Sequence, residues 1–513
     1  MRRPGFALAL LAAAAVPGCA TQGGGNVAME QARGGLKLTL LPSPGAQLVT
    51  IRVLVRSGAA QDPAGKEGLA SLTAAMLGSG GTASLPYEEL LRKLYPMAAE
   101  IGHHADKEVT VFVGQVHQER LDDFYPMFRD LFLAPRFDPA DFRRNRDDLV
   151  NAIEKNLRGN DDENLGKAAL ELSMYEGHPY GALDGGTVQG LKALTLEDAR
   201  AFFERHYTRD NVHLGVAGEL PPAFLDRILR DFLELPKGEP EPMALPEPRR
   251  SKGIEVVFVE KECRAPAISI GCPIGVTRAH EDFYPLMVAN SYLGEHRTFN
   301  GVLMNNMRGK RGLNYGDYSY VENFIQEGGS TFPLPNIPRR QQFFSIWIRP
   351  VRPENALFAL RQAVRELDRL VAQGLSQQDF ETTREFLINY SRLWAQTQSR
   401  RLGHLLDSKW YLGPQGDFLA EVQARLPRLT REQVNAAARR HLQAKDLVVA
   451  IVCKHAAALR EKLLSGAPTP IVYDTEGTPP EILTEDKAIE AYALPLNRER
   501  VRIVPAAGMF EKR

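Results

Sequence analysis

Apolar and polar residues alternate along two short segments near the start of the chain, LKLTLLP and LVTIRVLVRSG, which the turn-forming residues SPGAQ separate. This period of two, with many β-branched residues, predicts two strands. Apolar residues then recur at helical spacing, which predicts helices over residues 86–99, 119–133 and 139–174. A further helical pattern begins at Thr195, and Asp198 three residues later makes this start close to a capping box.

The same order of elements returns in the second half of the chain. The segments IEVVFVEKE and AISIGCPIG repeat the two strands at the start. Residues 429–453 repeat the helix-then-strand pattern of residues 194–218, and both segments carry Arg-His near the end of the helix. This internal duplication predicts an α+β fold made of two homologous halves.

We place the first domain at residues 35–236 and the second at residues 251–467. The prolines and charges of residues 237–250 favour an extended linker on the surface. Residues 468–513 are rich in proline and acidic in the middle. We expect this C-terminal extension to wrap the surface or reach a partner, with a disordered tail as the alternative.

The amino-acid composition is that of a globular protein and does not indicate a nucleic-acid-binding function. The chain has 513 residues, of which 44% are hydrophobic and 25% charged, an ordinary globular balance. Lys plus Arg equals Asp plus Glu at 63 each, so the net charge favours no polyanionic partner, and no nucleic-acid module is visible.

The N-terminus carries a targeting pattern. Arg2 and Arg3 precede an apolar run at residues 6–16, which suits a signal-peptide core and is too short to span a bilayer. Val-Pro-Gly-Cys follows and resembles a bacterial lipoprotein signal, in which Cys19 becomes the lipidated first residue. The alternative is a plain secretory signal cut near Ala20. Residues 1–19 would then be a signal peptide and residues 20–34 a tether, and we expect a protein of the cell envelope, in the periplasm and lipid-anchored to a membrane.

Three further cysteines remain if Cys19 is lipidated. Cys263 and Cys272 lie on predicted neighbouring strands and could pair, or they could be buried thiols, the commoner state of a cysteine in a strand. No cysteine spacing predicts a metal site.

One stretch carries most of the functional information: GAAQDPAGKEGLASLTAAMLGSGGT, residues 58–82. It predicts a loop followed by a short apolar helix, and its frame of Gly-Leu-Ala, Met-Leu and Gly-Gly-Thr resembles the zinc-binding helix of the pitrilysin/insulinase family of metallopeptidases. In that family the helix carries His-x-x-Glu-His. Here Ser71 and Ala75 stand at the two histidine positions, and Ala74 stands at the glutamate position.

These replacements remove the chemistry of the motif. Two histidines four residues apart share one helix face and can bind one zinc ion, while the glutamate acts as general base. Serine is a poor zinc ligand and alanine has no donor atom. The family's spacing to its third ligand, a glutamate, leads to Ala152, and a slip of one or two residues would give Asn151 or Glu154. We therefore expect no metal and no catalytic residue on this chain.

The resemblance extends over about residues 35–459, including GHPYG and MRGKRGLNYG. It implies two α/β-sandwich domains with mostly antiparallel sheets and helices packed on one side, which form half of a clamshell around a chamber. Two-domain members work as dimers, and some pair a zinc-bearing subunit with a zinc-less one. The missing ligands place this chain on the zinc-less side.

Within MRGKRGLNYG, Arg308 and Tyr315 match the arginine and tyrosine that the family uses to reach over the peptide near the zinc site. A guanidinium and a phenol are fixed donors that can bind a peptide carbonyl and the oxyanion formed from it. Arg311 is the neighbouring alternative to Arg308. The structural alternative is that Arg308 is a solvated helix residue and Tyr315 a core residue of a strand.

The remaining candidates have simpler interpretations. His103 and His104 are adjacent in a strand and point to opposite faces, so we expect a substrate-binding edge strand here rather than a metal site. His178 in GHPYG is expected to be structural. His206 and His441 end matching helices, where a histidine can favour the negative helix terminus, so we expect a shared structural role. The loop at residues 327–330 is predicted to be a turn that could gate the chamber.

The sequence thus predicts a non-catalytic, substrate-binding subunit of a heterodimeric peptidase, with zinc and His-x-x-Glu-His on the partner and peptides as substrates. A scaffold protein with the same fold and no proteolytic role is the alternative. An independent enzyme with relocated ligands would need three other converging donors, and the sequence shows no such set.

Overall fold

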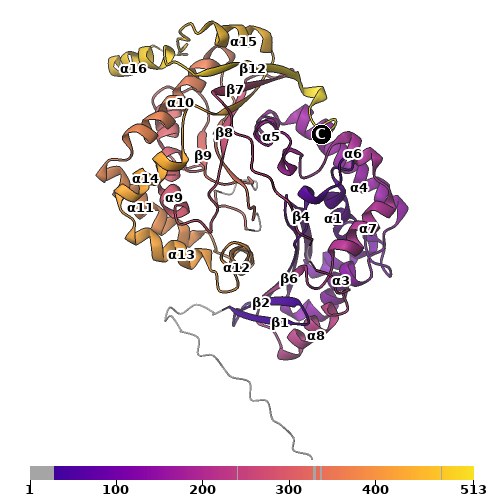
Figure 1. Ribbon diagram of the computed structural model, residues 1–513. Helices are drawn as coiled ribbons and strands as arrows, with labels where there is room; N and C mark the ends of the chain where they lie inside the picture. The colour runs from indigo at the N-terminus through magenta and orange to yellow at the C-terminus, as the bar shows by residue number, and fades with distance from the viewer. Residues whose placement is uncertain (1–27, 240, 327–330, 336–337, 475) are drawn as a thin grey trace, which may run out of the picture.

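The computed structural model describes residues 28–239, 241–326, 331–335, 338–474 and 476–513. The predicted signal peptide, Cys19 and the loop at residues 327–330 lie outside these ranges. The two halves form two lobes, each built on one mixed sheet with helices (Figure 1). The predicted α+β class with two homologous domains is therefore confirmed.

The first sheet has six strands in the order β1-β2-β6-β3-β5-β4. Only β2 and β6 run parallel; the other neighbours are antiparallel. The strands are β1 (Met29–Arg33), β2 (Leu36–Pro42), β3 (Leu48–Val55), β4 (Glu100–Ala105), β5 (Thr110–His117) and β6 (Val212–Gly218). β1 lies where the sequence predicted a tether, because its five residues pair in register with β2.

The second sheet repeats this plan in the order β12-β7-β11-β8-β10-β9. β12 and β11 both run parallel to β7, and the remaining pairs are antiparallel. The strands are β7 (Ile254–Glu260), β8 (Ala267–Ile274), β9 (Asp317–Tyr320), β10 (Gln342–Ile348), β11 (Val448–Cys453) and β12 (Leu496–Pro505).

Helices of matching order surround both sheets. Those of the first half are α1 (Leu69–Gly78), α2 (Tyr87–Leu94), α3 (Leu121–Leu133), α4 (Pro139–Asn151), α5 (Asp162–Met174), α6 (Val188–Ala193), α7 (Leu196–His206) and α8 (Pro222–Phe232). Those of the second half are α9 (Phe283–Gly294), α10 (Ala356–Gln373), α11 (Gln377–Tyr390), α12 (Gln398–Leu412), α13 (Phe418–Arg425), α14 (Arg431–His441), α15 (Ala456–Ser465) and α16 (Pro480–Glu490). Capping boxes at Thr195 and Thr430 start α7 and α14.

Two segments are π-helical: η4 (Ala152–Asn160) and η6 (Met304–Gly309). The helix predicted over residues 139–174 is consequently divided into α4, η4 and α5, and Asp161 caps the start of α5. None of the helices in the described ranges combines the length and apolar composition that a membrane span requires.

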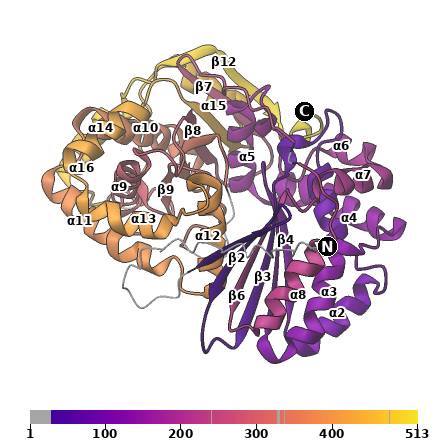
Figure 2. The same cartoon turned by 60° about the horizontal axis from the view of Figure 1, so that its bottom comes forward.

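The two halves exchange one helix each. α5 of the first half packs on β8 and β11, whereas α12 of the second half packs on β6, β3 and β2 (Figure 2). Leu402, Leu405 and Leu406 of α12 share a buried cluster with Leu54 and Val111 of the first sheet. Each sheet therefore has helices of its own half on one face and a helix from the opposite half on the other.

The C-terminal extension connects the halves instead of forming a disordered tail. It adds β12 to the second sheet and then reaches the first half, where Ala506, Met509 and Phe510 are buried in its core. The amides of Val188 and Gln189 donate to the carbonyls of Phe510 and Glu511 at 3.0 and 2.9 Å. The segment thus wraps the surface, as the sequence predicted, and joins the two lobes.

Removal of residues 506–513 should loosen this connection. We expect faster hydrogen exchange at the amides of Val188 and Gln189, because both lose their acceptors. Removal of Lys512 and Arg513 alone keeps both bonds and is the matched control. Unchanged exchange in the longer truncation would show that this segment does not hold the lobes together.

Candidate functional site

Helix α1 corresponds to the zinc-binding helix of the pitrilysin/insulinase family that the sequence resembles. Two local features fix the start of α1. Gly68 has φ of 107°, and a Cβ there would lie 2.9 Å from the carbonyl of Gly185, so this position needs glycine. The carboxylate of Asp62 accepts hydrogen bonds from the amides of Gly68 and Ala70 at 2.6 and 2.8 Å. Burial raises the pKa of Asp62 to about 7.

The three positions of the altered motif offer no metal site. The Ser71 hydroxyl donates to the carbonyl of Asp184 at 2.5 Å, so it is already engaged. Ala74 and Ala75 are buried, and the side-chain amide of Asn145 lies 3.4 Å from the carbonyl of Ala75. Neither histidine nor carboxylate stands at these positions, so they do not fit zinc.

The candidates for the third ligand do not supply one either. Ala152, the first residue of η4, is exposed and has no donor atom. Glu154 is also exposed and lies 3.5 Å from the Lys192 ammonium. Asn151 is half-buried and offers only an amide.

Buried cations occupy the neighbourhood of Ser71. The Lys107 ammonium lies 2.9 Å from the Asp184 carboxylate and 3.5 Å from Glu171, and it donates to the carbonyl of Ala182 at 2.5 Å. Arg339 of the second half binds Asp106 at 2.7 Å and Glu171 at 2.8 Å. The acidic side chains near the altered motif are thus neutralised by a lysine and an arginine.

Arg308 and Tyr315 lie side by side on the surface of the second half. The Arg308 guanidinium carbon is 4.6 Å from the centre of the Tyr315 ring and 5.4 Å from the Phe299 ring. Tyr315 and Phe299 are each 67% exposed, so Tyr315 is not a core residue. No carboxylate of the described residues lies within ion-pair distance of Arg308.

Arg311, the alternative, has a structural position. Its side chain is fully buried and binds Glu485 at 2.8 Å and Asp486 at 2.7 Å, both in α16. It therefore fastens the C-terminal extension and cannot reach a peptide on the surface.

His103 and His104 point to opposite faces of β4, as predicted. His103 stacks on Phe112, and a Cβ on Gly78 of α1 would strike its ring. Burial and the neighbouring His104 lower the pKa of His103 to about 4. His104 lies on the other face, 3.8 Å from Asp106. The two rings do not converge on one point.

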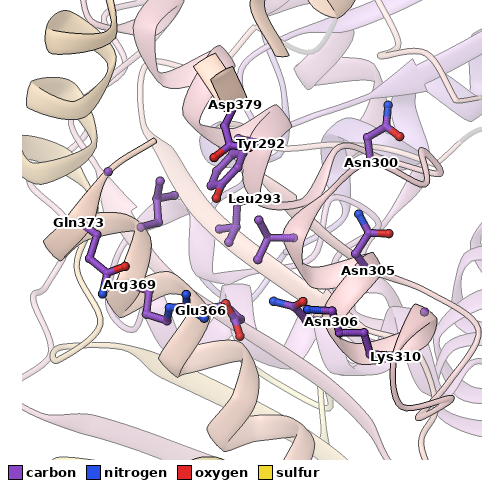
Figure 3. Close-up of a pocket in the computed structure, with 14 residues that line it drawn as sticks. Tyr292, Leu293, Asn300, Asn305, Asn306, Lys310, Glu366, Arg369, Gln373 and Asp379 are labelled. Carbon is purple, nitrogen blue, oxygen red and sulfur yellow. Dashed lines mark ion pairs between the residues drawn. The ribbon is translucent and has the colours of Figure 1, made fainter. Parts of the chain in front are cut away.

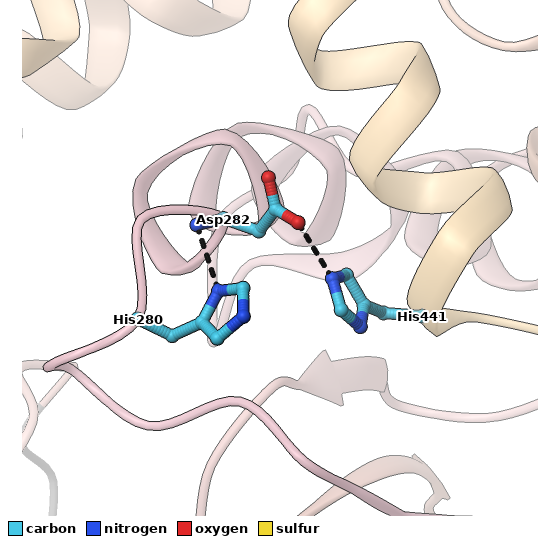
Figure 4. Close-up of side chains that lie close together, drawn as sticks. All are labelled: His280, Asp282 and His441. Atoms are coloured by element: carbon cyan, nitrogen blue, oxygen red, sulfur yellow. Dashed lines mark hydrogen bonds and ion pairs between the residues drawn. The ribbon is translucent and has the colours of Figure 1, made fainter.

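One group of possible metal ligands was not predicted: His280, Asp282 and His441 (Figure 4), whose donor atoms lie within 4.8 Å of one another. The Asp282 amide donates to His280 Nδ1 at 3.0 Å, so the neutral ring carries its proton on Nε2 and has no free lone pair there. Asp282 already binds His441 at 2.7 Å, and it also pairs with Arg440. The group therefore fastens the end of α14 to the start of α9.

The matching histidine of the first half makes different contacts. His206 is buried against Phe202, and burial lowers its pKa to about 4. A neutral His206 gains nothing from the negative helix terminus, so the two histidines share a place in the fold but not an interaction. His178 is buried and accepts a hydrogen bond from the amide of Tyr180, a structural role.

The three cysteines in the described part of the chain are free thiols. Cys272 and Cys453 are buried in strands, and Cys263 is half-buried in the loop that follows β7. Burial raises the pKa of the Cys272 thiol to about 12. The possible Cys263–Cys272 bond is therefore absent.

A polar cleft of about 520 Å³ lies behind η6, the segment that carries Arg308 (Figure 3). Four of its lining residues carry amide side chains: Asn300, Asn305, Asn306 and Gln373. Its buried carboxylate, Glu366, is paired with Arg365 and Arg369 at 3.5 and 3.6 Å. The negative charge of Glu366 is therefore neutralised by neighbouring arginines. Neither Arg308 nor Tyr315 lines the cleft.

We expect the purified chain to hold far less than one zinc per molecule after exposure to zinc, because no described set of three donors suits it. Metal analysis by mass spectrometry after desalting measures this directly. A near-stoichiometric content would contradict the assignment, and the variant His280→Ala/His441→Ala would then show whether that group is responsible.

Sequence comparisons identify the family. The profile described as "Insulinase (Peptidase family M16)" matches residues 38–182, and the profile described as "Peptidase M16 inactive domain" matches residues 193–387. An uncharacterized zinc protease of Bacillus subtilis, YmxG, is 22% identical over 420 residues, which cover 82% of this chain and 96% of the relative. A probable mitochondrial-processing peptidase subunit beta of Schizosaccharomyces pombe is 22% identical over 268 residues, 51% of this chain and 57% of that protein.

Solved structures show the same fold. A peptidase M16 inactive domain from Pseudomonas fluorescens superposes with a TM-score of 0.72 at 21% identity, covering 83% of this chain and 98% of that chain. A protease from Helicobacter pylori superposes with a TM-score of 0.71 at 15% identity, covering 83% and 100%. The chain is therefore a member of peptidase family M16, the insulinase family.

Proposed function

We propose that this chain is the zinc-less, peptide-holding subunit of a two-chain M16 peptidase of the cell envelope. Its partner would be an M16 chain of similar size with an intact His-x-x-Glu-His, and this partner would supply the zinc and the activated water. The N-terminal pattern around Cys19 supports a lipid-anchored place in the periplasm.

The observation that carries the proposal is the Arg308–Tyr315 pair, in which Tyr315 is exposed and Arg308 is half-buried. Both residues keep the family's identities, although Ser71, Ala74 and Ala75 have lost theirs. Arg308 lies over the exposed Tyr315 ring and the Phe299 ring, and it has no carboxylate partner among the described residues. Its free donors suit a peptide carbonyl or the oxyanion that develops from it.

The charges near Ser71 support a division of labour between two chains. Lys107 and Arg339 already neutralise Asp184 and Glu171, so a metal ion here would meet two buried cations. Zinc chemistry therefore belongs to another chain, and this chain contributes binding surface.

Reconstitution tests the proposal. The purified chain and a purified M16 chain with His-x-x-Glu-His from the same cells are assayed on unfolded peptides, alone and mixed. We expect cleavage by the mixture that greatly exceeds the sum of the separate activities. Full activity of the partner alone, with no gain on mixing, would favour the scaffold function.

A further inference from the structure

A second cavity, of about 320 Å³, lies between the two lobes and apart from Arg308 and Tyr315. Its size falls in the range of about 300–1,000 Å³ that is typical of small-molecule sites, which often form at domain interfaces. The first half contributes α5 and the loop with Asp184, the second half contributes β10 and Asn323, and the C-terminal extension contributes Phe510. All three parts of the fold thus meet here.

One wall carries a cation without a counter-ion. The Lys167 ammonium lies 3.8 Å from the centre of the Trp347 ring and 3.2 Å from the side-chain oxygen of Asn164. No carboxylate of the described residues lies within ion-pair distance of it. Burial lowers the pKa of Lys167 to about 8, although Glu163 and Asp161 oppose this shift. A bound anion would stabilise the charged form of Lys167 and raise this pKa again.

Asn323, which lines the same cavity, carries a buried donor. Asn323 is 8% exposed, and its side-chain nitrogen has no hydrogen-bond partner in the described part of the chain. A buried unpaired donor costs stability, and each such group in a native structure calls for an explanation. Lys107, which also lines the cavity, differs because it is paired with Asp184 and Glu171. Lys167 and Asn323 are thus the donors left for a ligand.

The other walls carry apolar and aromatic side chains, and the two carboxylates that also line the cavity, Glu171 and Asp184, are neutralised by Lys107 and Arg339. The apolar and aromatic residues are Leu170, Phe324, Phe343, Trp347 and Phe510. The ring of Phe324 lies 6.1 Å from that of Trp347, so the aromatic wall is continuous beneath Lys167. Such walls favour a ligand with an apolar or aromatic body.

We propose that this cavity binds a carboxylate carried on an apolar or aromatic body, with Lys167 and Asn323 holding the carboxylate and Trp347, Phe324 and Phe510 surrounding the body. Two sources share this chemistry: the C-terminal residue of a peptide and a free aromatic amino acid. All the residues of this site belong to this chain, so the binding proposal can be tested independently of the proposed peptidase function.

The test compares three probes by calorimetry on the full chain: acetyl-Ala-Phe with a free carboxylate, the same dipeptide as its C-terminal amide, and free phenylalanine. We expect the free acid to bind about tenfold or more tightly than the amide, because only the acid forms charge-assisted hydrogen bonds. Tighter binding of phenylalanine than of the acetylated acid would identify a free amino acid as the source, and the reverse would identify a peptide end. Both results support the carboxylate site.

Two variants locate the binding. Lys167→Gln should remove the preference for the acid, whereas Lys155→Gln, at an exposed lysine of η4, should not. Asn323→Leu removes a buried unpaired donor, so the fold should keep its stability while binding of the acid weakens. Equal affinity for acid and amide, binding unchanged in Lys167→Gln, or no binding of any probe would overturn the proposal.

Discussion

Replacing Arg308 by alanine and Tyr315 by phenylalanine together should lower kcat of the reconstituted two-chain peptidase about 100-fold or more. Loss of one donor to a developing oxyanion costs about 10²–10³ in kcat, because the donor is pre-oriented where charge appears. Arg308 and Tyr315 form one stacked unit at 4.6 Å, so the double change removes both donors. Steady-state rates on a quenched peptide measure the effect.

The matched control is Arg92→Ala/Tyr95→Phe in α2 and the turn that follows it. Tyr95 is 87% exposed, and the Arg92 side chain is 75% exposed. This pair should have no effect on rate. Equal activity of the Arg308/Tyr315 variant and this control would remove the role that we assign to the pair.

Replacing Arg339 by methionine should lower the free energy of unfolding by about 3–5 kcal/mol, the usual cost of breaking a buried ion pair on one side. Arg339 is 1% exposed and joins the two halves by binding Asp106 at 2.7 Å and Glu171 at 2.8 Å. Without it, the buried Asp106 carboxylate loses its guanidinium partner and keeps only the amide of Lys107 at 2.6 Å and the partly exposed His104 among the contacts of the described residues. Urea denaturation at pH 7 measures the loss.

The loss should depend on pH. Burial tends to raise the pKa of Asp106, but the Arg339 guanidinium and a hydrogen bond with His104 outweigh it and hold this pKa well below its usual range. A depressed folded-state pKa stabilises the fold above the unfolded value, about 3.9, and this stabilisation is lost as the pH falls further. The difference between wild type and Arg339→Met should therefore be smaller at pH 3 than at pH 7.

An exposed ion pair provides the comparison. Arg120 and Asp123 lie 3.4 Å apart with more than half of each side chain exposed, so Arg120→Met should cost less than about 1 kcal/mol. A similarly small effect of Arg339→Met, or one that is independent of pH, would show that the network around Asp106 does not hold the two halves together.

Much of the fold could be predicted because its signals are local. Period-two alternation marked β2 and β3, and the capping residue Thr195 marked the start of α7. The internal duplication predicted the same order of strands and helices in the second half. β1 and β12 were missed because they are edge strands whose residues carry no clear apolar alternation, and β1 is exposed along its whole length.

The contacts between the halves could not be predicted, because they join residues far apart in sequence. Asp106 and Arg339 are separated by 233 positions, and neither type of residue signals burial. The same holds for Lys167 over Trp347 and for His441 beside Asp282. Each becomes visible only when α5, α14 and the sheets are placed in space.

The altered motif was readable because its frame is local to one helix. Gly68, Leu69 and Ala70 keep the geometry of the helix start, while Ser71 and Ala75 change only the side chains on one face. The sequence could not reveal the contacts made around these positions, namely that the Ser71 hydroxyl donates to the Asp184 carbonyl and that Lys107 neutralises the Asp184 carboxylate.

The most direct test of the central claim is affinity purification of the tagged chain from the envelope of the cells that make it, with mass identification and metal analysis of the complex. We predict a partner of similar size in equal amount, with an intact His-x-x-Glu-His and one zinc per pair. Recovery of the chain alone, or only with proteins that lack this motif, would contradict the account and favour a scaffold function.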